Sequence, residues 1–234
     1  MSSLRNVQSP SPMCAIRSII SNRRLILEMI RREVIGRYRG SVMGLLWSFL
    51  TPVLMLVVYT FVFSIVFNAR WPGGSDSKTE FAMVLFIGLM VFNLFSECIL
   101  RAPALVLSNP NYVKKVIFPL EVLPLVSVGA AIFHFMVSML VWMLFHLLVF
   151  GIPPLAALWV PVAILPLVIL CVGLSWLLAS FGVYLRDVGQ VVGVITTMLM
   201  FLSPIFYPMT AMPEQFRVLM VLSPLTYYVE QARD

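Results

Sequence analysis

The chain has 234 residues, of which 61% are hydrophobic and only 11% are charged. A water-soluble domain has about 45–50% apolar and about 25% charged residues, so the composition excludes a soluble protein and predicts that a bilayer surrounds most of the chain. The net charge of +6 is typical of the cytoplasmic loops of a membrane protein, and we do not expect nucleic-acid binding.

The N-terminal region is predicted to contain a flexible tail, residues 1–18, and an amphipathic helix, residues 19–39. The apolar residues of this helix recur at spacings of three and four, at Leu27, Ile30, Val34 and Tyr38. Glu33 and Arg37 have the spacing of a favourable pair within one helix. Because arginines crowd its polar side, we expect the helix to lie in the headgroup plane of a membrane. An ordinary solvated helix is the alternative.

Three glycines follow one another at four-residue spacing, at Gly36, Gly40 and Gly44. Such a row allows another helix backbone to approach closely. It is equally typical of a flexible elbow between an interfacial helix and a membrane span. Both interpretations stay open at this point.

Long apolar stretches predict five membrane spans, at about residues 44–68, 81–100, 122–150, 158–184 and 188–203. Residues 101–121 are rich in proline and positive charge, and they predict a cytoplasmic segment with a short helix from Asn111 to Phe118. Residues 204–230 are split by prolines and predict a re-entrant segment on the outer side. The chain ends on a charged stretch, so we expect a sixth span to be missing, most simply by truncation.

The distribution of positive charge predicts the orientation. With the N-terminus in the cytoplasm, twelve of the 16 lysines and arginines fall on the inner side and four on the outer side. Positive residues accumulate in cytoplasmic loops. The sequence therefore predicts a cytoplasmic N-terminus.

Few ionisable residues lie inside the spans. Glu97 should face protein or water, or reach the interface with Arg101 as its partner, and we favour the second interpretation. His134 and His146 are twelve residues apart, about 120° around a helix, so a shared metal site is not expected. A proton-coupled carrier needs more buried charge than this. We therefore expect energy to enter from another protein, through the short basic segment 109–121.

Motifs of common enzymes are absent from the sequence. It contains no GxxxxGK[ST], no GxSxG and no HExxH. Asp76 and Glu80 are four residues apart on the predicted outer side, and we regard them as polar loop residues rather than the acidic pair of a transferase. We expect no catalytic, cofactor or metal site on this chain.

Several stretches resemble the membrane permeases of ABC-2-type exporters that move O-antigen, capsule and teichoic-acid polysaccharides. RYRGSVMGLLWSFLTPVLMLVVYTFVFSIVF is similar to their first span and NPNYVKKVIFPLEVLPL to the cytoplasmic segment between their second and third spans. YLRDVGQVVGVITTMLMFLSPIFYP is similar to their fifth span, and LSPLTYYVEQARD to the end of their outer re-entrant segment. The resemblance extends from about Arg23 to Asp234.

This resemblance implies an all-α membrane protein, the transmembrane domain of an ABC-2-type (type V) exporter, with residues 19–234 as one domain. It implies five spans of an expected six, a homodimer, and two copies of a separate ATPase that binds ATP and magnesium. It also implies location in the bacterial inner membrane and a polysaccharide cargo linked to undecaprenyl diphosphate.

The resemblance also implies roles for individual residues. The segment between Asn109 and Glu121 corresponds to a coupling helix on the ATPase, with candidate residues Asn111, Tyr112, Lys114, Lys115, Phe118 and Glu121. The interfacial helix corresponds to a gate, where a diphosphate would meet Arg31, Arg32, Arg37 and Arg39, although anchoring to anionic lipid is equally compatible. Spans one and five correspond to a glycan channel with candidate aromatic residues Trp47, Tyr59, Phe63, Phe201, Phe206 and Tyr207. Packing or an interfacial belt is the alternative for each aromatic residue.

Two other functions remain compatible with the sequence. The same fold serves exporters of drugs or small lipids. An intramembrane glycosyl- or polyprenyl-transferase is a third class, which the scarcity of outer carboxylates disfavours.

Overall fold

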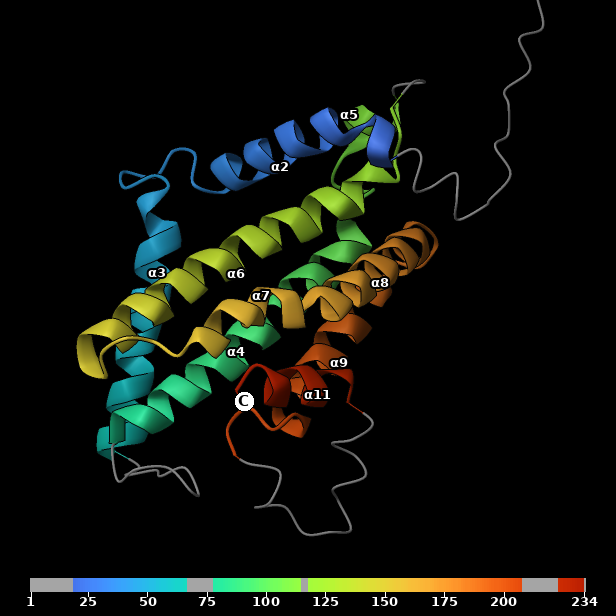
Figure 1. The fold of residues 1–234 in the computed structure, drawn as a ribbon. Helices are drawn as coiled ribbons and strands as arrows, with labels where there is room; N and C mark the ends of the chain where they lie inside the picture. The colour runs from blue at the N-terminus through green and yellow to red at the C-terminus, as the bar shows by residue number, and fades with distance from the viewer. Residues whose placement is uncertain (1–18, 67–77, 115–117, 208–222, 234) are drawn as a thin grey trace, which may run out of the picture.

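The computed structural model describes residues 19–66, 78–114, 118–207 and 223–233. Within these ranges the chain is almost entirely helical and contains no strand (Figure 1). The expected tail 1–18, Asp76, Lys115 and most of the outer segment 204–230 lie outside the described residues. The predicted all-helical membrane architecture is confirmed.

The long helices correspond to the predicted helix and spans. They are α2 (Arg23–Arg37), α3 (Leu46–Tyr59), α4 (Lys78–Arg101), α6 (Val122–Val149), α8 (Leu165–Tyr184) and α9 (Val188–Leu202). The short elements are the π-helical η1 (Thr60–Val66), η2 (Ala102–Ala104), α5 (Pro110–Val113), η3 (Leu155–Trp159), α7 (Val160–Ala163) and α11 (Pro224–Gln231).

Among the residues that the structure describes, four helical stretches are long and apolar enough to cross a bilayer, with mean hydropathies between 2.0 and 2.7. They are Leu46–Phe63, Thr79–Ala104, Val122–Val149 and Leu155–Tyr184. The helix α9, where a fifth span was expected, has 15 residues and is shorter than the roughly 20 residues that a helical span needs.

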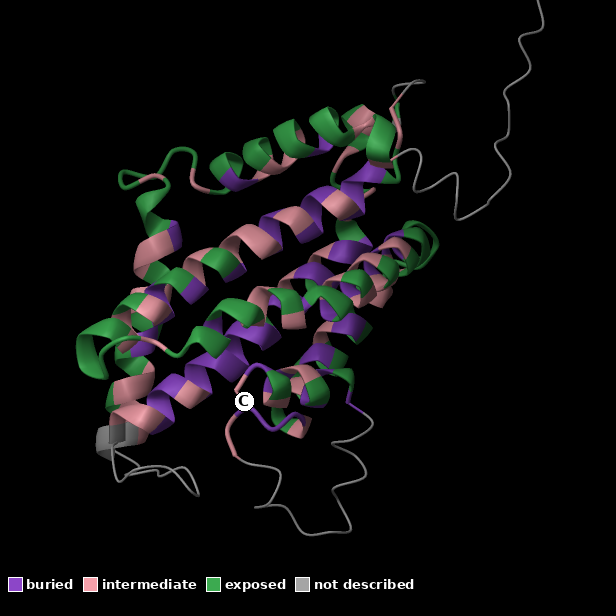
Figure 2. Cartoon of the chain, in the orientation of Figure 1, coloured by how far each residue is buried: buried purple, intermediate pink, exposed green. Residues whose placement is uncertain are grey.

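Helix α4 lies at the centre of the bundle. It packs against α3, α6, α8, α9 and α11, and 67% of its apolar stretch is buried, compared with 11% for α3 (Figure 2). Its fully buried residues include Leu85, Val91 and Cys98. The single chain therefore buries most of α4 and leaves most of α3 uncovered.

Helix α2 lies along the first part of α6, whereas α11 lies toward the opposite end of the bundle (Figure 1). We call these two regions the α2 end and the α11 end. The chain turns from α2 into α3 through Gly40 and Gly44, which both have positive φ angles, of 88° and 52°. No heavy atom lies within 4 Å of a Cβ built at Gly36, Gly40 or Gly44. Within this chain the glycine row is an elbow and not a helix contact.

Candidate functional site

The N-terminal half of α2 is attached to α6 by apolar contacts. Ile26 of α2 packs against Val122 of α6. Ile30 lies so close to Gly129 that a Cβ at this glycine would be 2.3 Å from the Ile30 Cδ1 atom. The predicted apolar face is wrong at one position, because Leu27 is 65% exposed and Ile26 is buried instead.

The C-terminal end of α2 is attached by charged and polar side chains. Arg37 donates a hydrogen bond to Oε1 of Glu97 on α4 at 2.6 Å, and its Nη1 lies 2.8 Å from Nδ1 of His134 on α6. The same His134 nitrogen lies 3.1 Å from both carboxylate oxygens of Glu97. The Tyr38 hydroxyl lies 3.3 Å from Nε2 of His134. We call these four residues, together with Arg101, the Glu97 cluster.

Arg101 joins the cluster to a second glutamate on α2. Its guanidinium is 3.7 Å from Glu97 and makes a closer ion pair with Glu33. The predicted Glu97–Arg101 pair is therefore present, but Arg37 is the nearer partner. The predicted pair between Glu33 and Arg37 is wrong, because each side chain finds a partner on another helix.

Two hydrogen-bond patterns are open to the Glu97 cluster. Nδ1 of His134 accepts a hydrogen bond from Arg37 when it carries no proton, and donates one to Glu97 when it does. It cannot do both at once. Glu97 and His134 were recognised as ionisable residues inside the spans, but no sequence spacing predicts that side chains 37 residues apart meet.

A polar groove lies between α2 and the segment around α5, and we call it the α2 groove. Its volume is about 790 Å³. Its polar lining residues are Glu28, Arg31, Arg32, Glu33, Arg39, Ser108, Asn109, Asn111, Tyr112 and Ser127. Three of the four predicted gate arginines thus share one groove with two predicted coupling residues. The fourth, Arg37, belongs to the Glu97 cluster instead.

The predicted coupling segment forms a shorter helix than expected. Helix α5 ends at Val113, and the predicted extension to Phe118 passes through residues 115–117, which are not described. The rings of Tyr112 and Phe118 stack at 4.6 Å between centroids, and Lys114 is exposed. The ring contact joins residues on either side of the stretch that the structure does not describe.

Helices α2 and α8 both touch this segment. Arg32 donates a hydrogen bond to the Tyr112 hydroxyl at 3.2 Å, and Trp176 Nε1 of α8 donates one to the carbonyl of Glu121 at 2.9 Å. The segment is therefore held by α2 on one side and by α8 on the other.

At the α11 end, four of the six candidate channel aromatics lie together. Phe63 stacks against Phe206 at 6.2 Å, and Phe206 against Phe201 at 6.0 Å. The Tyr207 hydroxyl donates to the carbonyl of Phe201 at 2.5 Å. The end of the first span and the end of α9 are thus side by side. Trp47 is partly exposed at the other end of α3.

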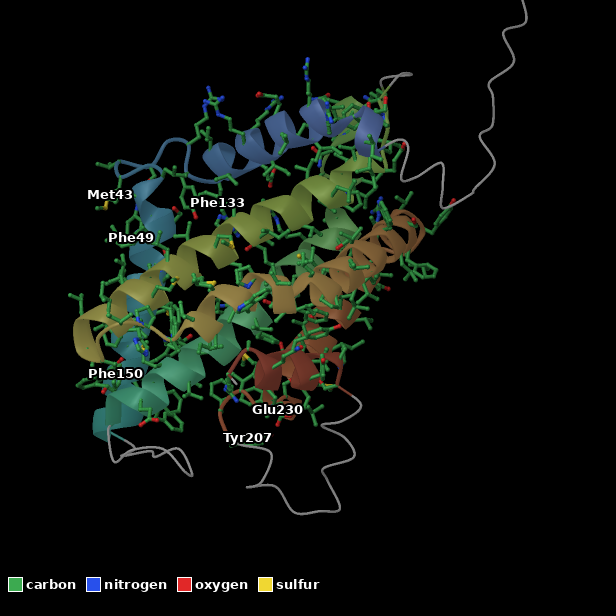
Figure 3. All side chains as sticks on the ribbon, viewed as in Figure 1. Met43, Phe49, Phe133, Phe150, Tyr207 and Glu230 are labelled. Carbon is green, nitrogen blue, oxygen red and sulfur yellow. The ribbon has the colours of Figure 1, made fainter. Side chains whose placement is uncertain are left out.

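Arg233 connects separate backbone segments at the α11 end, and no role was predicted for it from the sequence. Arg233 donates to three backbone carbonyls, those of Val84 at 3.2 Å, Pro204 at 2.5 Å and Ile205 at 2.8 Å. We call this arrangement the Arg233 clamp. Tyr207 and Glu230, which are close in sequence to Ile205 and Arg233 of the clamp, lie at the end of the bundle opposite α2 (Figure 3). Burial lowers the pKa of Arg233 to about 10, so the side chain stays charged at neutral pH.

Comparison with known proteins is consistent with this architecture. The family model "ABC-2 type transporter" matches residues 24–234. The O-antigen export system permease protein RfbA of Myxococcus xanthus is 30% identical over 222 residues, covering 90% of this chain and 79% of the relative. A protein of the same description from Klebsiella pneumoniae is 27% identical over 212 residues, with the same coverage. The polysialic acid transport protein KpsM of Escherichia coli is 24% identical over 212 residues, covering 87% of this chain and 77% of the relative. On the match to nearly its whole length, this chain belongs to the ABC-2 type transporter family.

Proposed function

We propose that this chain is the membrane-spanning permease subunit of an exporter that moves undecaprenyl-diphosphate-linked polysaccharide out of the cytoplasm. A separate ATPase subunit, present in two copies, supplies the energy. The observation that carries the proposal is the α2 groove, where arginines suited to phosphate and residues suited to ATPase contact line one cavity. The relatives described as O-antigen export permeases support the choice of cargo.

The arginines of the α2 groove have the chemistry to receive a diphosphate. Arg31, Arg32 and Arg39 outnumber the two glutamates that line the same groove. Guanidinium groups bind phosphate oxygens through paired, charge-assisted hydrogen bonds. In the proposed mechanism the diphosphate of the lipid carrier binds here before the glycan enters the bundle. Binding to anionic membrane lipid is the competing role.

The hydrogen bond between Arg32 and Tyr112 provides a mechanical link. A movement of the α5 segment against the ATPase would shift Tyr112 and therefore the arginine that donates to it. In this scheme Asn111, Tyr112 and Lys114 contact the ATPase, and α2 opens or closes the groove in response.

A second copy of the chain would complete the transport path. Helix α3 is only 11% buried in the single chain, and α9 leaves Val191, Val194, Ile195, Met198 and Phe201 exposed. Both helices thus have uncovered apolar faces. In a homodimer these faces meet, with the N-termini in the cytoplasm and the aromatic residues at the α11 end near the outer surface.

Complementation tests the proposed cargo and the role of the arginines together. Expressed with its ATPase in a permease-null strain, the chain should restore surface glycan, whereas R31Q/R32Q/R39Q should not. The control is R24Q, an exposed arginine of α2 that does not line the groove. Failure of the wild-type pair to restore glycan, or full export by the triple variant, contradicts the respective part of the proposal.

The coupling role has its own test. Lys114→Glu should reduce copurification of the ATPase, because the exposed positive charge of the segment is reversed. Arg186→Glu, an equally exposed charge between α8 and α9, is the matched control. Unchanged copurification of Lys114→Glu would remove this residue from the interface.

Export of a drug or small lipid would give a different result in the same strains. The permease-null strain would then accumulate no lipid-linked glycan in its cytoplasm, and it would become sensitive to the drug that the transporter normally exports.

A further inference from the structure

A polar recess lies between α3, α4 and α6, next to the Glu97 cluster. We call it the α3 recess, and its volume is about 410 Å³. This size falls within the range of about 300–1,000 Å³ that is typical of small-molecule sites. Its polar lining consists of Ser48, Thr51, Tyr59, Asn93, Ser96 and Ser138, together with Arg37, Tyr38, Glu97 and His134 of the cluster toward α2.

Of the six polar side chains outside the cluster, three already donate a hydrogen bond to a backbone carbonyl of their own helix. Ser48 donates to the Leu45 carbonyl at 2.7 Å, and Ser138 to the His134 carbonyl at 2.9 Å. Ser96 likewise donates to a carbonyl one turn earlier, at 3.2 Å. These serines retain acceptor lone pairs that point to no protein donor within the described ranges.

The other three side chains have no hydrogen-bond partner among the residues that the structure describes. They are the Thr51 hydroxyl, the Tyr59 hydroxyl and the Asn93 amide. Asn93 is exposed although it lies in the middle of α4, the most buried helix of the bundle. Polar groups at this depth are costly unless another group satisfies them, and they usually mark a ligand or ion pathway.

The charge of the recess favours a neutral ligand. Arg37 and Glu97 neutralise each other at 2.6 Å, and His134 bonds to both. An anion would meet the Glu97 carboxylate, and a cation would meet Arg37. The α2 groove differs because its three arginines favour an anionic ligand.

The remaining lining suits the apolar faces of a sugar ring. Phe86, Met55 and the Tyr59 ring also line the recess. Aromatic rings stack against the C–H faces of sugars, while amide and hydroxyl groups bond to the sugar hydroxyls. A water molecule alone would use the polar groups but not the aromatic wall.

The α3 recess and the α2 groove are lined by neighbouring residues at the C-terminal end of α2. Gly36 and Arg39 line the groove, whereas Arg37 and Tyr38 line the recess. The Arg37 side chain is 42% exposed, so the boundary between the two cavities is open to solvent. A diphosphate in the groove would therefore bring the first sugars of the attached chain to the mouth of the recess.

We propose that the α3 recess is a sugar-binding subsite, in which Thr51, Tyr59 and Asn93 bind neutral sugar rings of the cargo. This inference rests on the proposed function and adds a site behind α3, separate from the aromatic residues at the α11 end. Its ligand is neutral and polyhydroxylated, in contrast to the phosphate expected in the groove.

Thiol protection in the assembled transporter tests the subsite. Asn93→Cys is introduced together with Cys14→Ser, while Cys98 and Cys171 stay in place because both are fully buried. The rate of maleimide labelling is measured with and without oligosaccharides released by mild acid from the glycan of the permease-null strain. Ser108→Cys, an exposed position in the α2 groove that is not assigned to the ATPase contact, is the matched control, and pyrophosphate is the second probe.

The oligosaccharides should slow labelling of Asn93→Cys about tenfold at a concentration roughly ten times their dissociation constant, and leave Ser108→Cys unaffected. Pyrophosphate should do the reverse. Labelling that the oligosaccharides do not slow means that the recess holds only water, and absence of labelling means that lipid or side chains fill it. Either result overturns the subsite, as does protection of Asn93→Cys by pyrophosphate.

Two further measurements keep the outcome unambiguous. Ser96→Cys repeats the experiment at a second recess position and keeps all three side chains that are proposed to bind sugar, so the subsite is judged on both variants. Restoration of surface glycan by the wild-type pair is scored separately. Export without protection overturns the subsite alone, whereas failure of wild-type export overturns the proposed function.

Discussion

The two ends of the bundle use arginine in different ways. In the Arg233 clamp, the guanidinium donates to three backbone carbonyls that cannot move without unfolding their segments. In the Glu97 cluster, Arg37 contacts side chains of α4 and α6 that have a second hydrogen-bond pattern available, and it is 42% exposed. The clamp therefore suits a permanent connection, and the cluster suits a connection that can be released. Helix α2, which the cluster holds, is the element proposed to move.

Removal of the clamp should have the largest effect on stability. Arg233→Met keeps an unbranched apolar side chain but leaves the carbonyls of Pro204 and Ile205 without this donor. The Val84 carbonyl still accepts from the N–H four residues later in α4. We expect a loss of about 2–6 kcal/mol for the two carbonyls together, measured as a lower unfolding temperature of the detergent-solubilised protein. Arg233→Lys keeps the charge but not the several N–H donors of a guanidinium, so its unfolding temperature should lie between those of the wild type and Arg233→Met. Wild-type stability of Arg233→Met would mean that the clamp is not a fixed connection.

Neutralising the centre of the cluster should have a smaller effect, confined to α2. Glu97→Gln leaves Arg37 and Arg101 without their shared carboxylate, and we expect a cost of about 1–3 kcal/mol because the site is partly exposed. Hydrogen exchange should increase in α2 and not in α11. The wild-type cluster should also weaken with salt, whereas the clamp should not. Equal salt dependence at both ends would contradict the distinction between them.

The apolar attachment of α2 can be weakened without changing any charge. Gly129→Val places methyl groups where the Ile30 side chain lies, and overpacking of this kind costs about 1–3 kcal/mol. We expect faster proteolysis near the N-terminus of α2 while the Glu97 cluster stays intact. Ile30→Ala in the same chain should restore part of the protection. If it does not, then the two residues do not meet as the structure places them.

The smallest effect is expected where α2 meets the α5 segment. Tyr112→Phe removes the hydroxyl that accepts from Arg32, with a cost of about 0.5–1.5 kcal/mol. Thermal stability should change little, while glycan-stimulated ATP hydrolysis by the assembled transporter should fall. Phe118→Leu, which removes the stacking partner but not the hydrogen bond, is the control. Unchanged ATP hydrolysis in Tyr112→Phe would show that this hydrogen bond transmits no movement.

Local reasoning succeeded where the interaction is local. The expected third span at 122–150 and the observed α6 at Val122–Val149 agree closely, because a long apolar run in a bilayer must satisfy its backbone by forming a helix. The same reasoning failed at Leu27, where the spacing fits a helix but the true apolar face is rotated by one residue toward Ile26. Periodicity predicts that a helix has an apolar side, and the neighbouring helix selects which residues occupy it.

The composition and order of the residues were enough to predict an all-helical membrane protein and membership of the ABC-2 type transporter family. They also predicted an elbow as one of two interpretations of the glycines after α2. All three follow from properties of contiguous stretches. Only the tertiary structure shows that Arg37 pairs with Glu97 rather than with Glu33, and that His134 contacts both. It also shows that Arg233 donates to three carbonyls and that Asn93 lines a recess. These contacts join residues that are distant in the sequence, and their energies depend on distances of a few ångströms that only the packing of whole helices sets.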